Sequence, residues 1–144
     1  MNRINLICLG VRSMERSLDF YKGIGFRTYE QDACPPVVFF DNQGSKLELY
    51  PLEELARDID DRDPPALSPG GFGGVTLACN CRSPQEVDAV MALAAAQGGV
   101  IAKTPRTVFW GGYSGYFQDP DGYYWEVAYG PNWVYDDNGM LVID

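Results

Sequence analysis

The amino-acid sequence contains one pattern twice, and this repeat constrains the fold more than any other feature. Arg12-Ser13 and Arg82-Ser83 each precede a helical pattern. The turn Asp41-x-x-Gly44 recurs later in the chain as Asp119-x-x-Gly122. Such a unit is one supersecondary module, and a module with open strand edges must pair them with other strands. We therefore predict two modules built on the same plan.

Each copy contains the pattern of a strand, a helix and three further strands, which gives an α+β fold of two paired βαβββ modules. Ser13 is the expected N-cap of the first helix, and Ser83 with Glu86 forms a capping box at the second. In the first copy the predicted segments are INLICLGV (4–11), MERSLDFYKG (14–23), FRTYEQ (26–31), VVFFD (37–41) and KLELYP (46–51). In the second copy they are GVTLACN (74–80), PQEVDAVMALAAAQ (84–97), VIAKT (100–104), YSGYFQD (113–119) and YYWEVAY (123–129).

The predicted domain boundaries follow from these segments. The first module covers residues 1–52 and the second covers 74–130, with a tail over 131–144. Residues 53–73 are expected to form a linker or flap, because this region is rich in Pro, Gly and Asp. A short helix is expected at its start, in LEELARDID (52–60).

Composition excludes several classes of partner. The net charge of −9 argues against binding to nucleic acid or to an anionic membrane. No apolar run reaches membrane length and the N-terminus lacks a signal-peptide pattern, so we expect a cytoplasmic protein. The four cysteines are then expected to be reduced thiols, and Cys79 and Cys81, two apart in a predicted strand, are expected to be small buried residues. The chain contains no histidine, so no serine or cysteine can be activated as in a catalytic triad.

Two glutamates occupy equivalent positions in the repeat. Glu48 follows the first turn and Glu126 follows the second at the same interval, each inside the last predicted strand of its module. Strand alternation places Leu47 and Leu49 on one face and Glu48 on the other, and it separates Glu126 from Trp125 in the same way. The acids then lie on the concave face of a curved sheet. They could be ordinary surface charges on a wet face, but their equivalence favours a cavity, because ligand sites are concave and carry few polar groups.

Aromatic residues precede the second glutamate in VFWGGYSGYF (108–117). Gly115 inside this strand permits the close approach of a ligand or of another backbone. An aromatic core strand with a hinge is the alternative interpretation. Trp133 and Tyr135 of the tail are expected to pack as a lid or a dimer contact. The expected ligand-binding residues of this region and of the glutamate-bearing strand are Trp110, Tyr113, Tyr116 and Tyr124.

The segments LGVRSMERSLDFYKGIGF (9–26) and FWGGYSGYFQDPDGYYWEVAYGP (109–131) resemble the vicinal oxygen chelate superfamily. This superfamily groups glyoxalase I, extradiol dioxygenases and bleomycin-resistance proteins. The resemblance implies paired βαβββ modules that form a cup-shaped mixed sheet, commonly in a homodimer. In the metalloenzymes it also implies a metal held by two residues from the first strands and two from the last strands. These positions correspond to Leu6, Thr76, Glu48 and Glu126, and the resemblance therefore implies that Leu6 and Thr76 are also ligand-binding residues.

The residues at these positions do not match a transition-metal site. Leucine cannot ligate, a threonine hydroxyl is a weak ligand, and the chain offers no imidazole. The two carboxylates alone would hold Mg²⁺ or Ca²⁺ only loosely. Two unpaired carboxylates in a closed cup would repel each other. We therefore expect one of three arrangements: a cup open to water, a basic group such as Lys46 or Arg106 that pairs with them, or a cationic ligand that neutralises them.

The sequence therefore predicts a glyoxalase- or bleomycin-resistance-like protein that binds a small cationic or aromatic molecule without a tight transition metal or other cofactor. Metal-free acid–base chemistry by Glu126 and Glu48 is an open extension of this hypothesis. One alternative is a metal-dependent lyase or isomerase of the lactoylglutathione lyase type, which would take its missing ligands from water, substrate or a partner chain. Another is an interaction module with a vestigial cup. The identity of the ligand does not follow from the sequence.

Overall fold

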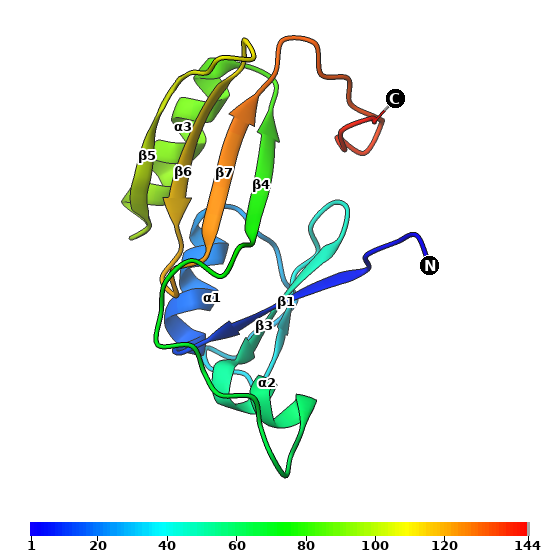
Figure 1. Cartoon of the computed structure of the whole chain (residues 1–144), viewed down its shortest axis with the longest axis vertical. Helices are drawn as coiled ribbons and strands as arrows, with labels where there is room; N and C mark the ends of the chain where they lie inside the picture. Colours follow the sequence, from blue (N-terminus) through cyan, green and yellow to red (C-terminus); the bar gives the residue numbers. More distant parts are fainter. Residues whose placement is uncertain (144) are drawn as a thin grey trace. The chain divides into compact units, whose positions relative to one another are not determined.

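A computed structural model describes residues 1–143, and the chain divides into two compact units (Figure 1). Unit 1 covers Met1–Phe72 and unit 2 begins at Gly73. Each unit has a small sheet with a helix against it. No helix among the described residues is long and apolar enough to cross a membrane.

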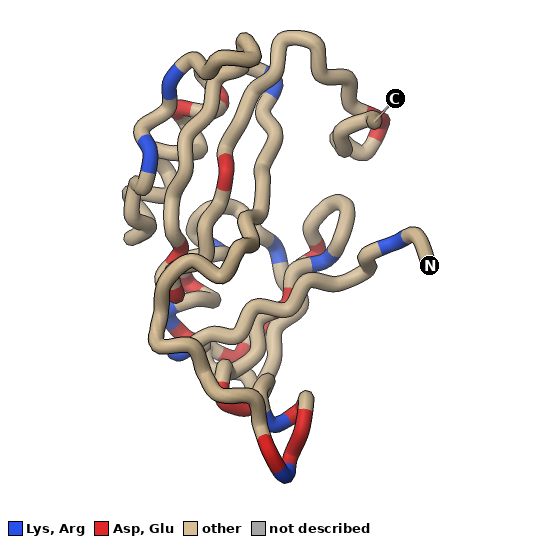
Figure 2. The backbone as a smooth tube through the Cα atoms, viewed as in Figure 1, with Lys and Arg blue, Asp and Glu red and all other residues tan. Residues whose placement is uncertain are grey.

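Unit 1 contains a three-stranded sheet in the order β1-β3-β2. Strand β1 runs parallel to β3, and β2 runs antiparallel to it. The predicted helix after the last strand is present as α2. The elements are β1 (Leu6–Val11), α1 (Met14–Gly23), β2 (Val38–Phe39), β3 (Lys46–Pro51) and α2 (Leu52–Ile59). Acidic residues gather in the segment that follows α2, where Asp60, Asp61 and Asp63 lie (Figure 2).

Unit 2 contains a four-stranded sheet in the order β4-β7-β6-β5, with α3 against one face (Figure 1). Strand β4 runs parallel to β7, and the other neighbours are antiparallel. Its elements are β4 (Thr76–Cys81), α3 (Pro84–Ala96), β5 (Val100–Thr107), β6 (Tyr113–Gln118) and β7 (Tyr124–Tyr129).

The strand register confirms the repeat. In unit 1 Cys8 lies opposite Glu48, and in unit 2 Ala78 lies opposite Glu126. The step along the chain from Cys8 to Ala78 equals the step between the two Arg-Ser pairs, and the step from Glu48 to Glu126 equals the step between the two Asp-x-x-Gly turns. The two glutamates therefore hold the same place in two copies of one module.

The predicted helix starts are confirmed. The Ser13 side chain accepts a hydrogen bond from the Arg16 amide at 3.3 Å, and Ser83 accepts one from the Glu86 amide at 3.1 Å. The Glu86 carboxylate accepts a hydrogen bond from the Arg82 amide at 2.6 Å. These contacts satisfy amide groups that a helix start leaves without partners.

The core follows the predicted alternation of the last strands. Leu47 and Leu49 are buried in β3, and Trp125 and Val127 are buried in β7. Glu48 and Glu126 lie on the opposite faces of these strands and are half-buried. Burial of the apolar sets, at about 25 cal/mol per Å² of apolar surface, fixes which face each acid occupies.

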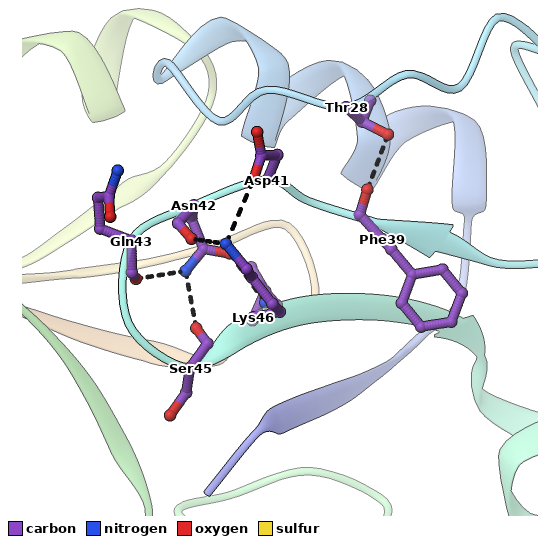
Figure 3. A network of polar contacts seen from close by, with 8 residues as sticks. Thr28, Phe39, Asp41, Asn42, Gln43, Ser45 and Lys46 are labelled. Atoms are coloured by element: carbon purple, nitrogen blue, oxygen red, sulfur yellow. Dashed lines mark hydrogen bonds and ion pairs between the residues drawn. The ribbon is translucent and has the colours of Figure 1, made fainter.

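The first module differs from the prediction because FRTYEQ forms no strand and VVFFD contributes only Val38–Phe39. One backbone hydrogen bond of the expected pairing remains, from the Asp41 amide to the Arg27 carbonyl at 2.7 Å. The Thr28 hydroxyl donates to the Phe39 carbonyl at 2.8 Å and so takes an acceptor that a strand ladder would use (Figure 3).

Local side-chain contacts explain why the strand does not continue. The Glu30 carboxylate accepts hydrogen bonds from the amides of Gln31 and Asp32, and Asp32 accepts one from the Cys34 amide. Such contacts replace the ladder with turns. Pro35 and Pro36 follow and have no amide hydrogen to donate. Phe26 instead packs edge-on against Tyr21 and Phe40, with ring centroids 5.4 and 5.6 Å away.

The expectation that Cys79 and Cys81 are buried is correct only for Cys81. All four are free thiols, and Cys81 is buried. Cys34 and Cys79 are exposed and Cys8 is half-buried. Cys79 lies on β4, which is an edge strand of its sheet, so fewer neighbours cover it.

Candidate functional site

A pocket of about 530 Å³ lies within unit 2, on the sheet face that carries Glu126. Strands β5, β6 and β7 and the loop between β5 and β6 supply its walls. The side chains that give it chemical character are Lys103, Arg106, Trp110, Ser114, Tyr116 and Glu126.

Strand register brings these residues to one face. Tyr116 of β6 lies opposite Glu126 of β7 and also opposite Lys103 of β5. Register shifts interrupt β5 on both sides of Lys103, and Arg106 then lies opposite Ser114. Gly115 permits this arrangement, because a Cβ atom there would lie only 2.8 Å from the Lys103 carbonyl oxygen. The absence of a side chain thus lets β5 cross close to β6.

Glu126 lies opposite Tyr116 within the pocket. The pKa of Tyr116 is raised, first by burial and then by a hydrogen bond to the Glu126 carboxylate and its negative charge. The Lys103 ammonium donates to the Ser114 hydroxyl at 3.2 Å and lies 5.5 Å from the centroid of the Tyr116 ring. With Arg106, the pocket carries two cations and one carboxylate.

The aromatic wall of the pocket comes from the loop between β5 and β6. Two backbone hydrogen bonds shape this loop, from the Val108 amide to the Gly112 carbonyl and from the Gly111 amide to the Val108 carbonyl, both at 2.9 Å. Gly111 has φ +88°, a conformation that side-chain-bearing residues rarely adopt. Trp110 retains 43% of its surface exposed, so its indole is accessible to a ligand.

Glu48 in unit 1 has different neighbours. The Cys8 thiol donates a hydrogen bond to it across the strand pair, and the pKa of Cys8 is raised to about 12, first by burial and then by the charge and hydrogen bond of Glu48. Phe39 lies opposite Glu48 in the register and is 54% exposed. Lys46 forms an ion pair with Asp41 at 3.2 Å (Figure 3), so its charge is directed to the turn rather than to Glu48.

The structure gathers some of the sequence-predicted residues and separates others. Trp110, Tyr116 and Glu126 line one pocket. Tyr113 lies on the helix side of the sheet, where its hydroxyl donates to Asp88 at 2.9 Å. Thr76 and Tyr124 lie opposite each other at the start of β4 and β7.

Leu6 is exposed at the start of β1, opposite Lys46. Sequence reasoning named Arg106 as a possible partner for a glutamate, but it missed Lys103 and Ser114. The irregular register of β5 hides the position of Lys103, because a bulge breaks the alternation from which a face is inferred.

A model of the glyoxalase/bleomycin resistance protein/dioxygenase superfamily matches residues 3–127. The chain belongs to this superfamily. The match spans both units and includes Glu48 and Glu126. No curated protein matches the chain.

Solved structures of the superfamily share the fold. A glyoxalase-related enzyme from Fulvimarina pelagi is 29% identical with a TM-score of 0.85, and the match covers 99% of both chains. A glyoxalase/bleomycin resistance protein/dioxygenase from Nocardioides is 26% identical, with a TM-score of 0.70 over 90% of this chain and 83% of the other. Lactoylglutathione lyase from Agrobacterium tumefaciens is 23% identical, with a TM-score of 0.66 over 90% of this chain and 95% of that one.

The metal that many superfamily members hold would require donors at the four equivalent positions. Leu6 supplies no donor atom and Thr76 supplies a hydroxyl, which leaves only the two carboxylates. In residues 1–143, no group of three or more Cys, Asp or Glu side chains is placed to hold an ion. Glu126 lies opposite Tyr116 and shares its pocket with two basic side chains, and Glu48 lies opposite Cys8. These residues do not fit a tight transition-metal site.

Proposed function

We propose that this member of the superfamily binds a small aromatic molecule in the pocket of unit 2, without a transition metal. The observation that carries the proposal is the set of side chains that line this one pocket. The Trp110 indole offers an aromatic face, Lys103 and Arg106 offer positive charge, and Glu126 with Tyr116 offers a hydrogen-bonded acid and hydroxyl. Ligand sites typically combine apolar walls with a few such polar groups.

The charge of the pocket favours an anionic group on the ligand. The sequence predicts a cationic or aromatic ligand, because two unpaired carboxylates would attract a cation. In unit 2, however, Glu126 shares its pocket with two basic side chains. A planar ring that bears a carboxylate would stack on Trp110 and place its anionic group near Arg106, whose guanidinium matches carboxylate geometry.

The pair of Tyr116 and Glu126 also gives the pocket the means to move a proton. A carboxylate within hydrogen-bond reach of a bound molecule acts as a general base, and here the Tyr116 hydroxyl orients that carboxylate. We propose Glu126 as the residue that would accept a proton in any metal-free reaction of this site. Glu48 remains a second candidate, and it lies opposite Cys8 in the strand pair.

Calorimetric titration with three probes of one shape tests the binding proposal. Naphthalene-2-carboxylate should bind more tightly than the neutral naphthalene-2-carboxamide, and a naphthalene with a trimethylammonium group should bind weakest. Arg106→Met should weaken naphthalene-2-carboxylate about tenfold, since losing a charged hydrogen bond costs about 1.5 kcal/mol. Arg57→Met is the matched control, because Arg57 lies on α2 in unit 1. Preferential binding of the cation, or no binding of any probe, contradicts the proposal.

The alternative function is that of a metal-dependent lyase or isomerase; the Agrobacterium tumefaciens neighbour is named a lactoylglutathione lyase. Elemental analysis after dialysis separates the two functions. We expect far less than one equivalent of Zn, Ni, Fe or Mn per chain. A stoichiometric transition metal that is lost in Glu126→Gln would establish the metalloenzyme instead.

We also propose that the protein forms a homodimer. In each unit the first strand, β1 or β4, lies at an edge of the sheet. It has one strand neighbour among the described residues. Strand edges of this kind pair with other strands. Light scattering should give twice the chain mass of 16.0 kDa. A stable monomer at micromolar concentration would refute dimer formation without affecting the pocket.

A further inference from the structure

The C-terminal tail, defined here as residues 131–143, docks onto unit 2. The Tyr135 hydroxyl donates to the Cys81 carbonyl at 3.0 Å, at the end of β4. The Arg82 guanidinium lies 4.9 Å from the centroid of the Tyr135 ring. Tyr135 also bridges Leu141, which closes the end of the tail into a small hairpin. These contacts place the tail beside the sheet rather than free in solvent.

The tail supplies one partner of an indole stack. The rings of Trp133 and Trp110 lie with centroids 5.6 Å apart and planes 24° apart. Two glycines make room for them. A Cβ atom on Gly112 would lie 1.8 Å from the Trp110 ring, and one on Gly130 would lie 2.5 Å from the Trp133 ring. Each indole therefore lies against bare backbone, and the stack depends on glycine at both positions.

We propose that Trp133 is a positioning residue of the ligand pocket, which holds Trp110 in place as the aromatic wall. The part of this proposal that concerns ligand binding rests on the proposed function. The part that concerns the position of Trp110 does not. Trp110 sits in a loop that has few other anchors, since the neighbouring Phe109 is fully exposed and the loop has two backbone hydrogen bonds of its own. The stack with Trp133 joins this loop to the C-terminal tail, beyond the strand pair that closes the loop at Thr107 and Tyr113.

The consequence concerns ligand selection. A wall fixed in advance costs a ligand less ordering entropy than a wall that must be ordered on binding. Aromatic ligands, which stack on Trp110, should depend on Trp133 strongly. A non-aromatic anion that contacts only Lys103 and Arg106 should not. The tail thereby sets the preference of the pocket for flat rings, although Trp133 is absent from its walls.

The structural part is tested without any ligand. Stacked indoles give a coupled signal in far-ultraviolet circular dichroism, which should disappear in Trp133→Ala. Hydrogen exchange of the Val108 and Gly111 amides should accelerate at least tenfold in this variant. The Asp119 amide, which bonds the Tyr123 carbonyl in a different turn, should be unchanged. Val134→Ala is the matched control, since Val134 is an exposed neighbour in the same tail. Unchanged exchange in the loop would overturn the proposal.

The binding part uses naphthalene-2-carboxylate and cyclohexanecarboxylate, which share a carboxylate but differ in aromaticity. Trp133→Ala should weaken the naphthalene compound about threefold to tenfold, as expected for one aromatic pair. It should leave the cyclohexane compound unchanged, and Trp133→Phe should restore most of the loss. Equal weakening of both compounds, or failure of Trp133→Phe to restore binding, would indicate a merely structural role.

The two proposals fail in distinguishable ways. If the unmodified protein binds neither compound, the proposed function fails, and the exchange and dichroism results alone decide the role of Trp133. If the unmodified protein binds naphthalene-2-carboxylate and Trp133→Ala binds it equally well, the function stands and the role of Trp133 is wrong.

Discussion

The two units place a glutamate at the same register position but surround it differently. In unit 1 the residue opposite Glu48 is Cys8, whose thiol donates a hydrogen bond to it. In unit 2 the residue opposite Glu126 on the parallel neighbour is Ala78, and the hydrogen bond comes from Tyr116 on the antiparallel side. The fourth strand of unit 2 adds Lys103 and Arg106 near Glu126. The described residues of unit 1 include no such strand, because FRTYEQ forms no strand.

This difference shows what a duplicated module retains and what it can change. The backbone register fixes where the carboxylate lies and which face it shares. The residues that surround each carboxylate are not constrained by the register. They depend on which side chain lies opposite and on whether an outer strand is present. In the copy that keeps all four strands, the repeated glutamate lies in a pocket with two basic side chains. The predictions below test this comparison, from the largest expected effect to the smallest.

Gly115→Ala should destabilise the protein most. The new Cβ would meet the Lys103 carbonyl oxygen at 2.8 Å, and a backbone atom in a paired strand cannot move away easily. We expect a loss of about 2–3 kcal/mol in the free energy of unfolding, as for other overpacked sites. Urea denaturation measures it.

The control is Gly10→Ala in β1 of unit 1. There the new Cβ would meet the end of the Leu52 side chain at 2.6 Å, and such an atom can rotate aside. The loss should therefore be clearly smaller. An equal or larger loss for Gly10→Ala would show that the close crossing of β5 and β6 is not a special constraint of unit 2.

Glu126→Gln should have the next largest effect. It removes a hydrogen bond to a charged acceptor and leaves Lys103 and Arg106 without the carboxylate, so we expect a loss of about 1 kcal/mol in stability. The pKa of Tyr116 should fall towards its ordinary value, which ultraviolet titration of the phenol detects. Glu48→Gln, which loses a bond from the weaker thiol donor, is the comparison and should cost less. If Glu126→Gln is instead more stable than the unmodified protein, the negative charge of Glu126 is not compensated by the basic side chains of the pocket.

Cys8 provides a third test, through pH. Its pKa is raised from 9.0 to about 12 in the folded state. Above pH 9 the unfolded chain loses this proton while the folded chain keeps it, so folding stability should fall as the pH rises from about 9 to 12. Cys8→Ala should make this fall shallower. Glu48→Gln should lower the Cys8 pKa in part, because burial is the larger cause. Melting curves across this range and iodoacetamide labelling rates measure the two effects.

Ala78→Cys sharpens the same comparison by moving the thiol to unit 2. The new thiol would lie opposite Glu126, as Cys8 lies opposite Glu48. Because Ala78 is exposed, burial should contribute less, and the new thiol should be labelled faster than Cys8 at pH 9. Equal labelling rates would mean that the carboxylate, rather than burial, dominates the Cys8 pKa.

The sequence was sufficient for the parts of the fold that depend on periodic burial and on caps. The alternation around Glu48 and Glu126, the caps at Ser13 and Ser83 and the repeat itself are all confirmed. These features are local, or they follow from which face of a strand is apolar.

The features that the sequence did not predict depend on competition between side chains and backbone for hydrogen bonds. The lost strand at FRTYEQ follows from Thr28 and Glu30 taking backbone partners, which its strand-like composition does not indicate. Lys103 was missed because a bulge in β5 breaks the alternation. Tyr113 was placed with the ligand residues, although strand parity puts it on the helix side, beside Asp88.

The smallest effect concerns Arg82 and the tail, which docks on unit 2 through Tyr135. Arg82 lies over the Tyr135 ring, and such a contact at a partly exposed site contributes about 0.5–1 kcal/mol. A double-mutant cycle with Arg82→Met and Tyr135→Leu isolates it, because the cycle cancels the loss of the Tyr135 hydrogen bond to Cys81. We expect a coupling of about 0.5 kcal/mol in urea denaturation. Arg82→Lys should recover only part of it, because the ammonium keeps the charge but cannot stack as a planar guanidinium does. A coupling of zero would mean that the contact of Arg82 with the Tyr135 ring does not hold the tail, which leaves Trp133 and the Tyr135 hydroxyl as its contacts. The repeated Arg-Ser pair would then make no contribution to the docking of the tail.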